Sequence, residues 1–264
     1  MTGRKVLISL VVLILFIGGI VFISGHFQPF LHTSTSLPPP VDLSQVKVAV
    51  VYESISDYRT IEVMTNGEYM RTIDDVINIL KETRADFVFR AFLRWQPVPE
   101  SPEEATWSQV VRGYTYKQLG EAISEIKREL PDIIISGGLC PQMLNARERN
   151  PITGEVLDRD KTWGMALDPQ KWGLSMSKKE FQCLFGKGEI IHTVPRDFDC
   201  SLYDPNKVSA YYPDITNEDW QELFLSWAKR LIDAGVDAIF IDLLFTQADV
   251  LPVSYTHLRA HETE

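Results

Sequence analysis

The chain has 264 residues, and its 26 lysines and arginines against 36 aspartates and glutamates give a net charge of −10 at pH 7. This acidic balance, without a basic cluster beyond the amino end, argues against nucleic acid as a partner. Three cysteines are too few for a disulfide-rich scaffold, whereas the stretch between the two unusual chain ends is long enough for one domain with a sizeable core.

The amino end has the pattern of a membrane anchor. Arg4 and Lys5 precede a mainly apolar stretch, residues 6–24, which is long enough to cross a bilayer as a helix. Because the positive residues come first, we expect residues 1–5 in the cytoplasm and the remainder outside it. No small-residue cleavage signal follows closely, which favours an uncleaved signal anchor over a removable signal peptide. Residues 25–45 contain the run TSTSLPPP and are expected to form a solvated linker.

Residues 46–251 predict a single domain of alternating strands and helices. An apolar run at 46–52 predicts a first buried strand, which ends at Glu53. Apolar residues at steps of three and four from Ile73 then predict a helix of about twelve residues.

A second strand is expected at residues 86–92, with Arg90 inside it and Trp95 just beyond it. An arginine in a buried strand has to meet a carboxylate or a ligand, because an unpaired buried charge is very costly. The sequence allows either partner. Residues 96–114 are rich in Pro and Glu and predict a long loop of the kind that shapes a binding cleft.

Residues 116–130 predict the next helix, and a third strand is expected to close on Gly137 and Gly138. Two glycines at a strand end allow either a tight turn or a close approach of the backbone to a ligand, and the turn is the simpler interpretation. The glycine spacings typical of nucleotide-binding loops are missing, so nucleotide binding has little support.

The middle of the chain has weaker periodicity. We expect a fourth short strand at residues 163–168, ending in Asp168, and then a helix at 175–185 with Ser177 as its cap. Another strand is expected at 188–194 and carries His192, which is more typical of a core histidine than of a catalytic one. Cys183 and Cys200 either pair across a loop or remain buried free thiols.

The stretch from residue 211 to 242 has the clearest pattern. Tyr212 ends a short strand, and Thr216 or Asn217 is expected to cap a helix that begins near Glu218. The apolar run 236–241 then predicts a strand that is covered on both faces, as in a parallel sheet. Asp242 follows it directly.

Four acids follow predicted strands, and the carboxyl ends of parallel strands meet at one edge of a sheet or barrel. They are Glu53, Asp168, Asp214 and Asp242. Asp242 is the first candidate for a nucleophile or base, and Asp168 or Glu53 for a protonated acid. Asp214 precedes a helix, so capping is its alternative role. Four other residues near strand ends are candidates to contact a substrate: Arg90, Trp95, Trp163 and Tyr212.

The segment DITN, a helix and then AGVDAIFID resembles a pattern of several (β/α)8-barrel glycoside hydrolase families, including α-galactosidase-like and polygalactosaminidase-like enzymes. The resemblance covers about thirty residues and implies a sugar-cleaving barrel with an acid at Asp242 and another at Asp214. We therefore expect a membrane-anchored partial barrel of about six strands that hydrolyses glycosidic bonds. A sugar-binding or structural surface barrel without turnover is the alternative.

The carboxyl end, residues 252–264, is expected to be foreign to the fold. The run VSYTHLRAHET resembles the in-frame translation of a transposase-based sequencing adapter. This interpretation removes His257 and His261 as a metal-binding pair, and no other metal-ligand spacing or cofactor motif is found. We expect that the domain is cut short before this tail.

Overall fold

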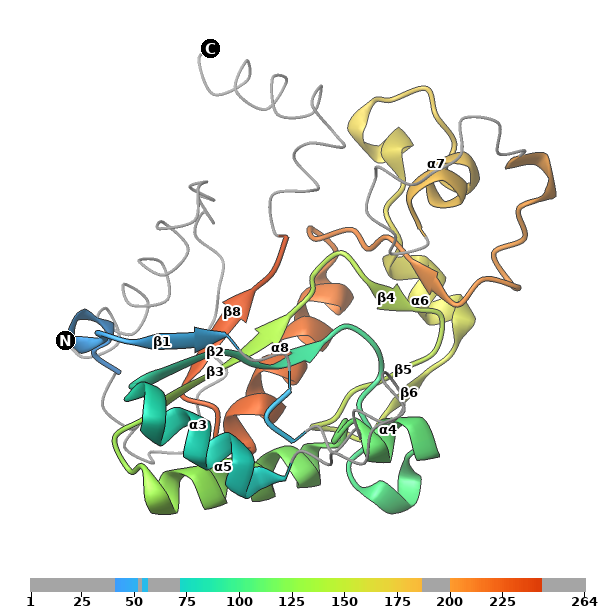
Figure 1. Cartoon of the computed structure of the whole chain (residues 1–264). Helices are drawn as coiled ribbons and strands as arrows, with labels where there is room; N and C mark the ends of the chain where they lie inside the picture. Colours follow the sequence, from blue (N-terminus) through green and yellow to red (C-terminus); the bar gives the residue numbers. More distant parts are fainter. Residues whose placement is uncertain (1–40, 52–53, 57–71, 187–199, 244–264) are drawn as a thin grey trace, which may run out of the picture. The chain divides into compact units, whose positions relative to one another are not determined.

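Figure 1 shows a computed structural model of the chain, which describes residues 41–51, 54–56, 72–186 and 200–243. The chain divides into two units, residues 1–45 and 46–264. The described part of the first unit contains one short 3₁₀ helix, η1 (Leu43–Gln45). No helix among the described residues is long and apolar enough to span a membrane. The predicted anchor, Glu53, His192 and the carboxyl-terminal tail lie outside this part of the chain.

Four parallel strands form the main sheet of the second unit (Figure 1). Their order is β1 (Ala49–Val51), β2 (Phe87–Arg94), β3 (Ile134–Leu139) and β8 (Ala238–Ile241). The predicted α/β class with a parallel sheet is confirmed. Among the described residues these four strands form an open sheet, whereas the sequence predicts about six strands of a barrel.

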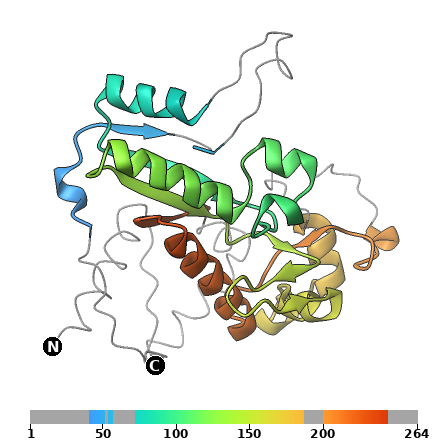
Figure 2. The same ribbon diagram turned by 90° about the horizontal axis from the view of Figure 1, so that it is seen from below.

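Three amphipathic helices run alongside the strands (Figure 2) and share one apolar core with them. They are α3 (Ile73–Thr83), α5 (Tyr116–Glu129) and α8 (Glu218–Asp233), as predicted. Each begins at a side-chain cap, because the first N–H groups of a helix have no partner inside it. Asn217 caps α8 by accepting from the Trp220 N–H at 3.0 Å, which decides between the two predicted caps.

The opposite face of the sheet is only partly covered within the described residues. Phe89 and Phe240 meet there edge to face, with ring centroids 4.7 Å apart. All four residues of β8 are half-buried, and Val51 at the end of β1 is 67% exposed. The expectation of strands covered on both faces is therefore not met by β1 and β8 in this part of the chain.

Gly137 and Gly138 lie inside β3, so the predicted tight turn is wrong. A Cβ on Gly138 would lie 2.8 Å from Leu93 Cδ1 and 3.4 Å from Arg90 Cγ. The glycine is needed because the side chains of β2 lie over it. The strand pairing shifts at this place: Val88 pairs with Ile135, but Phe92 already pairs with Gly137, and Arg90 has a left-handed φ of 60°.

The described residues 140–186 and 200–216, between β3 and α8, form an irregular region, named here the β3–α8 insert. It contains two small antiparallel pairs, β4 (Leu144–Asn145) with β7 (Ala210–Tyr211), and β5 (Glu148–Arg149) with β6 (Val156–Leu157). Its helical elements are α6 (Arg159–Met165), η3 (Pro169–Trp172), α7 (Lys178–Phe185) and η5 (Cys200–Leu202).

Two predictions are corrected, one in this insert and one between β2 and α5. The strand expected at 163–168 is wrong, because α6 continues to Met165, and only Ala166 then bridges to Pro213. The Asp158 cap, which accepts from the Lys161 N–H, starts that helix. The loop predicted at 96–114 contains two short helices, η2 (Pro102–Glu104) and α4 (Trp107–Val111). The helix predicted at 175–185 is confirmed as α7, with Ser177 as its cap.

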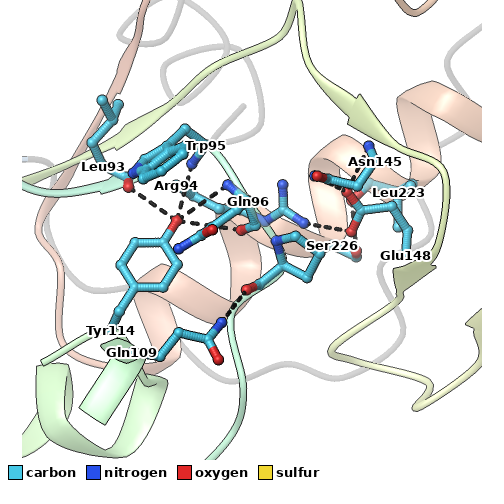
Figure 3. A network of polar contacts seen from close by, with 11 residues as sticks. Leu93, Arg94, Trp95, Gln96, Gln109, Tyr114, Asn145, Glu148, Leu223 and Ser226 are labelled. Atoms are coloured by element: carbon cyan, nitrogen blue, oxygen red, sulfur yellow. Dashed lines mark hydrogen bonds and ion pairs between the residues drawn. The ribbon is translucent and has the colours of Figure 1, made fainter. Parts of the chain in front are cut away.

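Two long-range links hold the insert. Cys183 and Cys200 form a disulfide, which resolves the open alternative for this pair, while Cys140 is free and buried. Arg94, at the end of β2, pairs with Glu148 at 2.7 Å, and both side chains are almost fully buried (Figure 3). The Arg94 guanidinium also lies over the Trp227 ring of α8, 3.2 Å from its centroid.

Candidate functional site

Asp242 lies where β8 ends at the carboxyl edge of the parallel sheet. Its N–H donates to the Leu139 carbonyl at 2.8 Å, so the ladder between β3 and β8 extends to this residue. Side chains two residues apart on a strand point to the same face, which places Asp242 on the face of Phe240. Its half-buried carboxylate makes no hydrogen bond or ion pair within the described residues.

The thiol of Cys140, which directly follows β3, has two charged neighbours: Asp242 after β8 and Arg90 of β2. Burial raises the pKa of the Cys140 thiol and the Asp242 carboxylate raises it further, whereas hydrogen bonds with Gln142 and, to a lesser degree, the Arg90 guanidinium lower it. Asp242 and Arg90 therefore both lie within electrostatic range of this thiol. Arg90 is half-buried, it lies at the register shift of β2, and its Cγ is close to Gly138 of β3.

Asp168 and Asp214 come together in a second group, around Lys178 of α7. The half-buried Lys178 ammonium donates to the Trp163 carbonyl at 2.5 Å and lies 4.6 Å from the centroid of that ring. Burial lowers the pKa of Lys178, whereas the carboxylates of Asp168 and Asp214 raise it. Lys171 lowers it as well, and its ammonium is 3.9 Å from the buried Asp214 carboxylate.

Both of these acids also have a local structural role. Asp168 caps η3 by accepting from the Gln170 N–H at 3.1 Å. Asp214 accepts from the Thr216 N–H at 3.0 Å and from the Thr216 hydroxyl at 2.6 Å, which fixes the turn before α8. Helix capping, the alternative role considered for Asp214, is therefore the role of Asp168. Asp214 instead shapes the turn before α8, whose cap is Asn217.

An open pocket of about 560 Å³ lies beside the second group. Its lining comes from η3, the Asp214 turn and the first turn of α8: Lys171, Trp172, Asp214, Thr216, Asn217, Glu218 and Asp219. The pocket thus contains Asp214 but neither Asp168 nor Asp242. The three described acids therefore fall into two groups, Asp242 in one and Asp168 with Asp214 in the other, and Glu53 lies outside the described residues.

The three predicted aromatic contacts differ in exposure. Trp95 is 40% exposed and follows β2 directly. Trp163 is half-buried between Tyr211, at 5.1 Å edge to face, and Lys178. Tyr212 is 3% exposed and packs with Leu167 and Phe181, so its ring offers no open face to a sugar.

Sequence patterns did not identify Lys178, Gln182 or Glu148. Lys178 and Gln182 are one turn apart in a helix that the pattern predicted, but their partners lie in segments far away in the chain. Glu148 lies in a two-residue strand without periodicity. Its only signal was the presence of Arg94 at a strand end, which requires a carboxylate somewhere.

Comparisons with known proteins do not assign the chain. No protein-family model matches it, and no curated protein matches it. Within the described residues there is also no group of three or more His, Cys, Asp or Glu side chains that could hold a metal ion.

Proposed function

We propose that this chain is a membrane-anchored, extracytoplasmic glycoside hydrolase-like protein and that its parallel sheet is part of a (β/α)8-type barrel. The observation that carries the proposal is the position of Asp242. A half-buried carboxylate that no described residue binds lies at the carboxyl end of a parallel strand, the edge where α/β enzymes place their active sites.

Glycoside hydrolysis requires two carboxyl groups, one ionised and one protonated. Asp242 takes the role of nucleophile or base, and Arg90, which like Asp242 acts electrostatically on the Cys140 thiol, donates to sugar hydroxyls. The protonated partner is Asp168 or Glu53. Trp95, the most exposed of the predicted aromatic contacts, provides a face for a sugar ring.

The extracytoplasmic location has two sources of support. Residues 6–24 have the length and flanking charges of an anchor. The disulfide between Cys183 and Cys200 is of a kind that persists in oxidising compartments and is rare in the cytosol.

A sugar-binding protein without turnover is the second candidate. One observation favours it: Asp168 and Asp214 both accept hydrogen bonds that fix local turns, which leaves Asp242 as the one predicted acid without such a bond in the described residues. A single free carboxylate can bind a sugar but does not complete the pair that hydrolysis requires.

The test compares the full chain with its Asp242→Asn and Asp132→Asn variants. Asp132 is an exposed acid just before β3, at the opposite edge of the sheet, and is the matched control. The probes are 4-nitrophenyl α-galactoside and a galactosamine polymer, assayed for nitrophenol and reducing ends. We expect hydrolysis by the unchanged chain and by Asp132→Asn, and its loss with binding retained in Asp242→Asn. Binding without hydrolysis by the unchanged chain would support the second candidate, and neither binding nor hydrolysis would reject both.

A further inference from the structure

Gln182 is a fully buried polar residue on α7, and its carboxamide contacts the backbone of two separate segments. Its Nε2 donates to the Leu167 carbonyl at 3.0 Å and to the Tyr212 carbonyl at 2.8 Å. Its Oε1 accepts from the Tyr212 N–H at 2.7 Å. One side chain therefore satisfies three backbone groups that have no access to water.

The two segments that Gln182 holds pair with each other as a short antiparallel ladder. The Leu167 N–H donates to the Tyr212 carbonyl at 2.9 Å, and the Asp214 N–H donates to the Met165 carbonyl at 2.9 Å. Asp168 follows this ladder directly in the first segment, and Asp214 ends it in the second. The contacts of Gln182 are thus made within two residues of both carboxylates.

Lys178 repeats the arrangement one turn earlier on α7. Lys178 donates to the Trp163 carbonyl, and Gln182 donates to the Leu167 carbonyl, so two α7 residues four apart contact two carbonyls four apart. This face of α7 lies against the segment that leads to Asp168. The neighbouring Cys183 carries the disulfide to Cys200, which anchors the same helix from its end.

We infer that Gln182 is a positioning residue: through these backbone contacts it fixes where the Asp168 and Asp214 carboxylates lie. The inference rests on the proposed function for its consequence in catalysis. Its structural part, the fixed spacing of the two acid-bearing segments, is measurable without any activity.

The closing experiment uses the full chain with Gln182→Met, which keeps the length of the side chain but removes its hydrogen bonds. The matched control is Gln118→Met in α5, where another buried glutamine, 7% exposed, bonds to Val110 and Thr115 instead. Hydrogen exchange of peptides that cover residues 165–168 and 211–214 reports the segments. Initial rates on the two glycoside probes separate kcat from KM.

We expect Gln182→Met to lose exchange protection in both peptides and to lower kcat about 100-fold with little change in KM, because a small displacement of a reacting group is enough for that loss. Gln118→Met should keep the exchange protection of both peptides and the kcat of the unchanged chain. Unchanged protection in Gln182→Met, or lost protection with unchanged kcat, would overturn the inference. If the unchanged chain hydrolyses neither probe, the proposed function fails, and the exchange data alone still decide whether Gln182 fixes the two segments.

Discussion

The parallel sheet and the β3–α8 insert are stabilised in different ways. In the sheet, strands and amphipathic helices bury their apolar faces in one shared core. Each helix begins at its own side-chain cap. In the insert, short elements depend on a few specific links between distant residues: one disulfide, one buried ion pair and one buried glutamine. A single substitution in the sheet should therefore lower stability by an amount that depends on its site. The loss of one link should instead destabilise the whole insert.

The largest effect is expected from Glu148→Ala. This change leaves the Arg94 guanidinium charged and buried without its partner, which costs about 3–5 kcal/mol. Urea unfolding of the full chain, followed by tryptophan fluorescence, measures the difference. Glu129→Ala, which breaks the exposed pair with Lys81, is the control and should leave the unfolding midpoint nearly unchanged. Equal midpoints for the two variants would show that the buried pair does not hold the insert.

A smaller loss is expected from the double change Cys183→Ser and Cys200→Ser. The disulfide closes a loop across a sequence separation of 17, for which chain entropy predicts a stabilisation of about 3 kcal/mol. Hydrogen exchange should show the loss mainly in the insert and little change in β2 and β3. Cys140→Ser, which removes the free thiol, is the control. Uniform loss of protection over both regions would contradict the distinction drawn between them.

Removing a helix cap should change the free energy of unfolding by less than the loss of the disulfide. Asn217→Ala removes the cap of the 16-residue α8, which packs on the sheet, and should cost about 1 kcal/mol of global stability. Ser177→Ala removes the cap of α7, in the insert. We expect the second change to increase exchange in α7 without moving the global unfolding midpoint. The comparison fails if both variants shift that midpoint equally.

The last difference is a pH dependence near the carboxyl end of β2, which has no effect on stability below about pH 10. Burial raises the pKa of Tyr114 and of Tyr116 to about 12, from an ordinary value of 10.0. A raised pKa in the folded state means that the folded chain keeps its protons longer than the unfolded chain. The stabilisation is complete below pH 10 and is lost as the pH rises through about 12. Ultraviolet absorbance of the phenolates should show late titration that Tyr116→Phe reduces; ordinary titration of every tyrosine would contradict it.

The elements of the sheet could be predicted from the sequence because their signals are local. The apolar spacing in α3, α5 and α8 and the side-chain caps that start them act within a few residues. The role of Gly138 was predicted wrongly. A glycine is needed there because the Leu93 side chain on the neighbouring strand leaves no room for a Cβ, and no local pattern reveals that contact.

The candidate site was predictable only in part. The position of Asp242 follows from one strand and its end, so the sequence was sufficient. The grouping of Asp168 with Asp214 depends on an antiparallel contact between Ala166 and Pro213 and on α7, and these are tertiary contacts. The predicted strand at 163–168 failed for the same reason: its first half belongs to the capped helix α6, and its apolar residues Met165 and Ala166 pack into the main core.

The neighbouring positions of β3 and β8 also have a consequence for the order of folding. The link between Asp237 and the Ile135 N–H joins residues 102 apart in sequence, whereas β1, β2 and β3 pair across much shorter connections. Each doubling of loop length adds only about 0.6 kcal/mol of closure entropy, but pairings of high sequence separation still tend to form later in folding than local ones. During synthesis the first three strands can assemble early, and the last strand must wait until the whole insert has left the ribosome. Asp242 would then reach its place only after β1, β2 and β3 have paired, so the proposed chemistry cannot begin on the first three strands alone.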